Sequence, residues 1–157
     1  STVSDVEDFY RIYQDPSITK YMERLFPDRD EERSYMKDYI QKIYGFYGFG
    51  LWSVIHTVTG TVIGRAGLSV REGYEIPELG FVTEVAFQHQ GYTYEICEAI
   101  LRYARDELEF PQVQAFCHPE NTASLHLLQK LGFTYAGEDL LQGIPHARYI
   151  VSLPKSC

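Results

Sequence analysis

The spacing of apolar and polar residues divides the chain into helical and extended segments. Near the N-terminus, "SDVEDFYRIYQDP" starts with Ser4 as a candidate N-cap and has Glu7 three residues later, which is the pattern of a capping box. We expect a short helix there that stops before Pro16. A second helix is expected from Asp30 to Tyr44, since acidic residues open it and a helical stripe follows at Tyr35, Tyr39, Ile40 and Ile43.

The period then changes to that of strands. In "GFGLWSVIHTVTGTVIGRAGLSV", two β-branched, aromatic-rich runs flank "VTGT", which predicts a hairpin around Gly60. The run "PELGFVTEVAF" predicts a further strand, Glu78 to Val85, antiparallel to its neighbour. From Gly91 to Leu108 the apolar positions return to helical spacing. The longest predicted helix therefore begins at a glycine.

The last third of the chain continues this alternation. A strand "VQAFCH" precedes a helix from about Asn121 to Leu131, which Gly132 ends, and two strands follow, "FTYAGEDLL" and "HARYIVSL". The helix from Gly91 is long enough to cross over between parallel strands. We therefore predict an α+β sandwich: a mostly antiparallel central sheet flanked by helices, with one parallel pair between the strand ending near Val85 and residues 113–117. Without repeats or linkers, residues 1–157 are expected to form a single domain.

Composition narrows the function. Fourteen Lys plus Arg stand against 22 Asp plus Glu, a net charge of −8, which argues against a nucleic-acid partner and mildly favours cationic partners, although it also serves solubility. The three cysteines are odd in number and lack CxxC spacing, which favours reduced thiols in a cytoplasmic protein. No apolar run is long enough for a membrane span, and the histidines show no metal-ligand spacing. We expect a soluble protein with no membrane partner and no metal.

The turn before the helix at Gly91 is the first candidate for chemistry. A helix N-terminus presents unpaired N–H groups and the positive end of the helix dipole, so it can bind an anion, above all a phosphate. Gly91 has no side chain to keep phosphate oxygens from those donors. The alternative is that Gly91 is an ordinary turn residue.

Two motifs in this order resemble a known family. The segment "ELGFVTEVAFQHQGYTYEICEAIL" is similar to the pantetheine strand and pyrophosphate loop of the GNAT superfamily of N-acetyltransferases, whose loop reads Q/R-x-x-G-x-G/A, with Gln88, Gly91 and Thr93 at its three defined places. Downstream, "NTASLHLLQKLGF" is similar to the family's N-x-x-S/A-x-x-x-x-x-K-x-G-F block. The chain resembles the ribosomal-protein and polyamine acetyltransferase-like branches.

The resemblance implies acetyl-CoA as co-substrate. Its pantetheine arm would pair like an extra strand with Phe81, Val82 and Thr83. Its pyrophosphate would lie on the loop formed by Gln88, His89, Gln90, Gly91, Tyr92 and Thr93. Asn121 matches a residue that reaches the cofactor from the other side, and it also fits the role of a helix N-cap.

The resemblance also suggests catalytic residues. Glu78 matches a strand carboxylate that relays the amine proton, although it could be a solvated strand-end charge, and Ser124 matches a small hydroxyl residue placed near the thiolate. Leu128 stands where many members carry a proton-donating tyrosine, and His89 replaces the loop's frequent first glycine. Weaker candidates for the acceptor wall are Tyr44, Phe46, Tyr47 and Trp52.

The implied activity is transfer of an acetyl group from acetyl-CoA to a primary amine of a small molecule or a protein N-terminus, by direct attack with general-base assistance. The alternative is a non-catalytic acyl-CoA-binding or interaction module of the same fold. The family's first strand is not found ahead of the first helix. A homodimer is left open.

Overall fold

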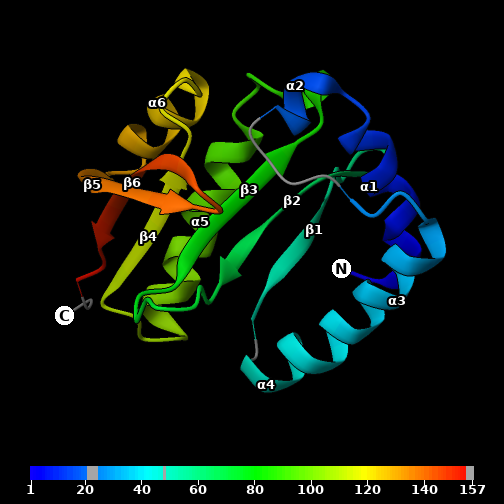
Figure 1. Cartoon of the computed structure of the whole chain (residues 1–157), viewed down its shortest axis with the longest axis horizontal. Coiled ribbons are helices and arrows are strands. Elements are labelled where there is room, and N and C mark those ends of the chain that lie inside the picture. Colours follow the sequence, from blue (N-terminus) through cyan, green and yellow to red (C-terminus); the bar gives the residue numbers. More distant parts are fainter. Residues whose placement is uncertain (21–24, 48, 155–157) are drawn as a thin grey trace. The chain divides into compact units, whose positions relative to one another are not determined.

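The computed structural model describes residues 1–20, 25–47 and 49–154, without the side chain of Phe46. Six strands follow the order β1-β2-β3-β4-β6-β5 (Figure 1). The backbone forms two compact units. The N-terminal unit comprises Ser1–Gly67 and Phe81–Thr93, and the C-terminal unit comprises Leu68–Gly80 and the described residues from Tyr94 onward.

The N-terminal unit is mostly helical at its start. Its elements are η1 (Val3–Asp5), α1 (Val6–Tyr13), α2 (Pro16–Thr19), α3 (Arg29–Tyr39), the π-turn η2 (Ile40–Tyr44), α4 (Gly45–Tyr47), β1 (Leu51–Ile55), the first part of β2 (Val62–Ser69), the end of β3 (Glu78–Thr83) and η3 (Val85–Phe87). The C-terminal unit holds the beginning of β3 and most of α5 (Tyr92–Asp106), with β4 (Gln112–Cys117), α6 (Thr122–Lys130), β5 (Thr134–Leu141) and β6 (Ile144–Ser152).

The first helical segment begins earlier than predicted. Thr2, and not Ser4, is the N-cap, and the Thr2 N–H donates to Asp5 Oδ2 at 2.8 Å within a capping box. The prediction of a Ser4 cap was wrong because Ser4 already lies inside η1. The predicted stop before Pro16 is confirmed, since α1 ends at Tyr13.

The helix that begins with α3 buries only part of the predicted stripe: Tyr39 and Ile40 pack against the core, but Tyr35 does not. Glu32 and Met36 are only 3% and 0% exposed, whereas Tyr35, expected on the core stripe, is 49% exposed. The buried carboxylate is satisfied locally, because the Phe26 N–H donates to Glu32 Oε2 at 3.0 Å. The predicted helix end at Tyr44 falls short, because the π-turn Ile40–Tyr44 continues directly into α4, which ends at Tyr47.

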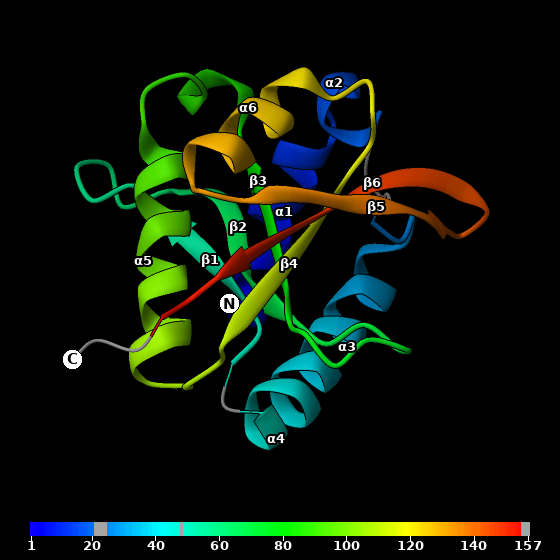
Figure 2. The ribbon, with the colours of Figure 1, turned by 90° about the vertical axis from the view of Figure 1, so that its left-hand side faces the viewer.

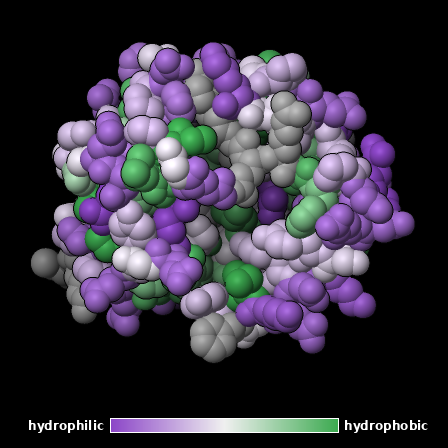
Figure 3. Space-filling model, in the orientation of Figure 1, coloured by the Kyte–Doolittle hydropathy of each residue, from purple (hydrophilic) through white to green (hydrophobic). Residues whose placement is uncertain are grey.

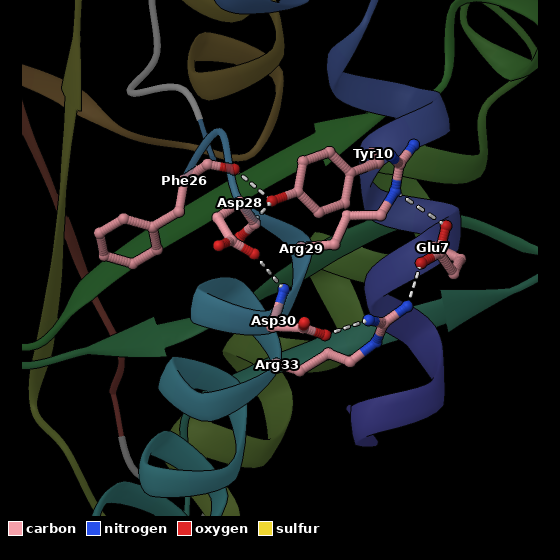
Figure 4. A network of polar contacts seen from close by, with 7 residues as sticks. All are labelled: Glu7, Tyr10, Phe26, Asp28, Arg29, Asp30 and Arg33. Carbon is pink, nitrogen blue, oxygen red and sulfur yellow. Dashed lines mark hydrogen bonds and ion pairs between the residues drawn. The ribbon is translucent and has the colours of Figure 1, made fainter.

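Exposed ion pairs connect α1 and α3, which lie side by side in Figure 1. Glu7 on α1 accepts from both Arg29 and Arg33, and Arg33 also pairs with Asp30 (Figure 4). Tyr10 donates to the Phe26 carbonyl in the same network. Hydrophilic side chains cover the outer side of α3 in Figure 3. Ion pairs as exposed as these each contribute little to stability, so apolar packing supplies most of the free energy that holds α1 against α3.

That packing centres on α1. Val6, Phe9 and Ile12 are buried against a cluster that includes Met36 and Val62. The predicted hairpin around Gly60 is confirmed, with β1 antiparallel to β2 and Ser53 opposite Arg65. The guanidinium of Arg65 lies 4.6 Å from the Phe9 ring centroid, which provides a partner for a mostly buried charge.

The C-terminal unit contains the predicted parallel pair. Strand β3 pairs with β4 in parallel, with Glu78 opposite Gln114, while β4 with β6 and β5 with β6 are antiparallel. In Figure 2 the turn of the β5–β6 hairpin projects away from α5. The mixed α+β class, with a mostly antiparallel six-stranded sheet, is therefore confirmed. Throughout the described ranges, no helix combines the length and apolarity needed to cross a membrane.

Candidate functional site

The predicted phosphate loop begins where β3 ends. The strand stops at Thr83 and not at Val85 as predicted, because residues 85–87 form the 3₁₀ turn η3, in which the Phe87 N–H donates to the Glu84 carbonyl at 2.9 Å. The Glu84 N–H donates to the Ile63 carbonyl at 2.7 Å and ties the strand end to β2. The backbone therefore turns before it reaches the helix, which leaves the loop exposed in front of α5.

Side chains of the loop hold its own shape. Gln88 donates to the Thr83 carbonyl at 2.9 Å, and Gln90 donates to the Ala86 carbonyl at 3.0 Å. The hydroxyls of Thr83 and Thr93 lie 2.7 Å apart and join the strand end to the first turn of α5. Four of the predicted cofactor-binding side chains thus stabilise the loop itself, so binding would fall to the backbone.

The backbone of the loop is suited to an anion. His89 and Gly91 adopt positive φ angles of 61° and 85°. In the N-terminal unit, no described residue accepts from the N–H groups of Gln90 or Gly91, and the first N–H groups of a helix have no partner within it. A Cβ atom placed on Gly91 would meet nothing within 4 Å, so the space beside this residue is open. The loop therefore fits a phosphate.

Two residues that the sequence did not reveal support this loop. His56, at the end of β1, lies 3.2 Å from the Tyr92 hydroxyl through Nε2, and its ring centroid is 5.1 Å from that of Phe87. Arg11 of α1 donates to Glu84 Oε1 at 2.5 Å and to the Val62 carbonyl at 2.7 Å. Neither partner is near the loop in sequence, so only the tertiary structure could identify them.

The candidate base, Glu78, lies in the C-terminal unit at the beginning of β3. Arg71 donates to both of its carboxylate oxygens, at 2.6 and 3.0 Å, and the Glu78 side chain is 14% exposed. The interpretation of Glu78 as a solvated strand-end charge is therefore wrong. Each carboxylate oxygen has a second lone pair, so the ion pair leaves capacity to accept a proton.

Asn121 and Ser124 are neighbours in the C-terminal unit. Asn121 is the N-cap of α6, and its Oδ1 accepts from the Ser124 N–H at 3.3 Å. Burial raises the pKa of the Cys117 thiol to about 11, and a hydrogen bond from the Ser124 side chain opposes that rise. Leu128 is buried in the core, so this position of α6 supplies no proton donor. The Ser124 side chain therefore lies beside a thiol of the protein itself.

The residues proposed for the acceptor wall fall in the N-terminal unit. Tyr44 donates to the Leu51 carbonyl, so its hydroxyl has a structural role. Tyr47 is exposed and its ring centroid lies 5.5 Å from that of Phe49, while Trp52 on β1 is half-buried. The side chain of Phe46 lies outside the described part of the structure.

No group of three or more His, Cys, Asp or Glu side chains able to hold a metal occurs in residues 1–20, 25–47 and 49–154. The predicted cofactor strand and loop, Phe81 to Thr93, belong to the N-terminal unit together with the acceptor-wall candidates. The catalytic candidates Glu78 and Ser124 and the cofactor candidate Asn121 belong to the C-terminal unit.

Comparison with known proteins places these features in a family. The acetyltransferase (GNAT) domain family matches residues 1–134. An uncharacterized N-acetyltransferase, YnaD of Bacillus subtilis, is 28% identical over 134 residues, which is 85% of this chain and 75% of YnaD.

Solved structures share the fold. The ribosomal-protein-S5-alanine acetyltransferase from Vibrio fischeri superposes with a TM-score of 0.81 at 13% identity, covering 98% of this chain and 90% of that one. A chimera of the spermidine N-acetyltransferase SpeG from Vibrio cholerae superposes with a TM-score of 0.79 at 16% identity, covering 98% and 92%. With the family match over most of its length, the chain belongs to the GNAT family of acetyltransferases.

Proposed function

We propose that this acetyltransferase moves the acetyl group of acetyl-CoA to a primary amine of a small molecule or of a protein N-terminus. The observation that carries the proposal is the exposed loop before α5, where the N–H groups of Gln90 and Gly91 lack acceptors in their unit. We further propose that residues 1–157 act as one domain and that the protein works in the cytoplasm.

The loop would bind the pyrophosphate of acetyl-CoA through its backbone. Free N–H groups and the helix dipole favour a negative group there, and Gly91 allows its oxygens to approach. The backbone of Phe81, Val82 and Thr83 would pair with the pantetheine arm, and Asn121 would contact the cofactor through a side chain that also caps α6.

Bound acetyl-CoA supplies an acetyl group activated as a thioester. The amine attacks once it is neutral, so a proton must leave it, and Glu78 is the carboxylate that would accept that proton. As the carbon–nitrogen bond forms, the carbon–sulfur bond breaks. Because Leu128 is apolar and buried, we propose that solvent protonates the departing thiolate.

The test is a turnover screen across a panel of amines, with a thiol-detecting dye to measure the released CoA. The panel should contain polyamines, amino acids and short peptides with free N-termini, since the structural relatives include spermidine and ribosomal-protein acetyltransferases. Release that depends on one class of amine would support the proposal. Binding of acetyl-CoA by calorimetry with no release above the hydrolytic background would instead favour the non-catalytic acyl-CoA-binding module.

A further inference from the structure

A second arginine near Glu78 is held in place without an ion pair. Arg148 of β6 donates through Nε to Gln114 Oε1 at 2.8 Å, and Gln114 is completely buried. The same amide donates through Nε2 to the Ile76 carbonyl at 2.9 Å. Arg148 Nε can only donate and the Ile76 carbonyl can only accept, so the Gln114 amide has one orientation. The oriented amide in turn holds the Nε edge of the Arg148 guanidinium in place.

Aromatic contacts fix the plane of the same guanidinium. Its carbon lies 5.3 Å from the ring centroid of Tyr74, and that ring meets Phe116 edge-on with centroids 5.4 Å apart. The Tyr74 hydroxyl donates to Asp139 Oδ2 at 2.7 Å, which holds the ring from its far end. Phe116 is opposite Arg148 in the β4–β6 register, so these side chains share one face of the sheet.

The two arginines of this face differ in their charge partners. Arg71 is neutralised by Glu78, and its guanidinium lies 5.2 Å from the Phe116 ring centroid. Within the described residues of its unit, Arg148 forms no ion pair, and its side chain is half-buried. The terminal N–H groups of Arg148 are therefore the ones left to bind an anion, and a guanidinium binds a planar carboxylate best.

Arg148 and Glu78 lie within reach of one small molecule. Glu78 is opposite Gln114 on β4, and β4 pairs in turn with β6, which carries Arg148. Two strand spacings, about 10 Å, and an offset of two residues along the strands separate the backbones of Glu78 and Arg148, and both side chains extend from the same face of the sheet. This arrangement suits a molecule that carries an amine at one end and a carboxylate at the other.

We infer that the acceptor is a small amino acid-like molecule whose carboxylate binds Arg148 and whose amine lies at Glu78. The inference rests on the proposed function and narrows its substrate class. The fixed guanidinium selects for a carboxylate because little side-chain freedom is lost on binding. Gln114 is a positioning residue for Arg148.

The test uses matched acceptors: linear amino carboxylates of increasing length, the alkylamine of each length, and the diamine of each length. Wild type should prefer one amino carboxylate over its alkylamine and diamine by about 10- to 100-fold in kcat/KM. Arg148→Met should bring this ratio toward one, Arg148→Lys should retain part of it, and Arg148→Glu should shift preference to the diamine. Arg102→Met, which removes an exposed arginine of α5, is the matched control and should leave the ratio unchanged.

Calorimetry with the same ligands separates the two proposals. If no acceptor turns over but an amino carboxylate binds in an Arg148-dependent way, the proposed function fails and the carboxylate site stands. If amines turn over and wild type prefers alkylamines or diamines, or if Arg148→Met lowers every acceptor equally, the carboxylate site is overturned. Should Arg148→Met not fold because Gln114 loses its partner, Arg148→Lys, which can still donate to Gln114 Oε1, decides the result.

Discussion

The loop from Gln88 to Thr93 and the cluster around Glu78 are built in opposite ways. In the loop, side chains are used for bracing and the backbone presents the free hydrogen-bond donors. In the cluster, backbone pairing sets the strand register and side chains carry the charges, with Glu78 paired to Arg71 and Arg148 held by Gln114. A backbone site tolerates many side chains and suits a cofactor common to a family, whereas a side-chain site can differ between members and suits an acceptor.

Removal of the base should have the largest effect. If Glu78 accepts the amine proton, Glu78→Gln should lower kcat on the order of 10²-fold and leave acetyl-CoA affinity little changed. The loss should be greatest at the low end of a profile from about pH 6 to 9, where solvent alone is the poorest base. Glu75→Gln, an exposed carboxylate three residues earlier, is the control. If the mutant keeps the wild-type kcat across this range, Glu78 is not the base and its role is limited to the ion pair with Arg71.

A charge placed in the loop should act on the cofactor alone. Gly91→Glu brings a carboxylate against the phosphates and should weaken acetyl-CoA binding about tenfold or more. Gly91→Gln carries the same strain at a φ of 85° without the charge, so the difference between the two variants isolates electrostatics. Equal affinities for both variants by calorimetry would contradict the phosphate site.

The ion pair beneath the loop should matter for stability more than the exposed network of Figure 4. Glu84 Oε2 is buried without a hydrogen-bond partner, and Arg11 is the ion-pair partner of Glu84 Oε1. Arg11→Met removes this ion pair and should lower the free energy of unfolding by about 1–3 kcal/mol. Arg33→Met removes only exposed contacts and should cost less than about 1 kcal/mol. Urea unfolding of both variants measures this, and equal losses would show that the two sets of pairs do not differ.

The smallest expected effect is the reaction of the protein's own cysteines with the thiol-detecting dye. These cysteines must react slowly if the dye is to report released CoA. Burial raises the pKa of Cys97 to about 12 and that of Cys117 to about 11. A raised pKa keeps a thiol protonated, so both cysteines should react slowly at neutral pH in the native Cys157→Ser protein and readily in denaturant. Fast labelling of the native protein would show that one of them is accessible.

The sequence alone determined the features that depend on neighbouring residues. Turn chemistry, helix capping and connection length act over a few residues or along one element. The sequence could therefore predict the glycine before α5, the N-cap Asn121, the hairpin at Gly60 and the crossover that makes β3 and β4 parallel. The family motifs added the proposed location of the cofactor strand and loop.

Only the tertiary structure decided which residues support the site. The periodicity of α3 placed Tyr35 in the core, yet packing against α1 buries Met36 and a satisfied Glu32. Gln114 and Arg148 are 34 residues apart in sequence and meet only through the pairing register of β4 and β6. No pattern of neighbouring residues could therefore predict their contact. Contacts of this kind depend on strand pairing and side-chain packing over the whole sheet. The spacing of apolar and polar residues along the chain does not encode them, because the free energy that favours them comes from residues distant in sequence.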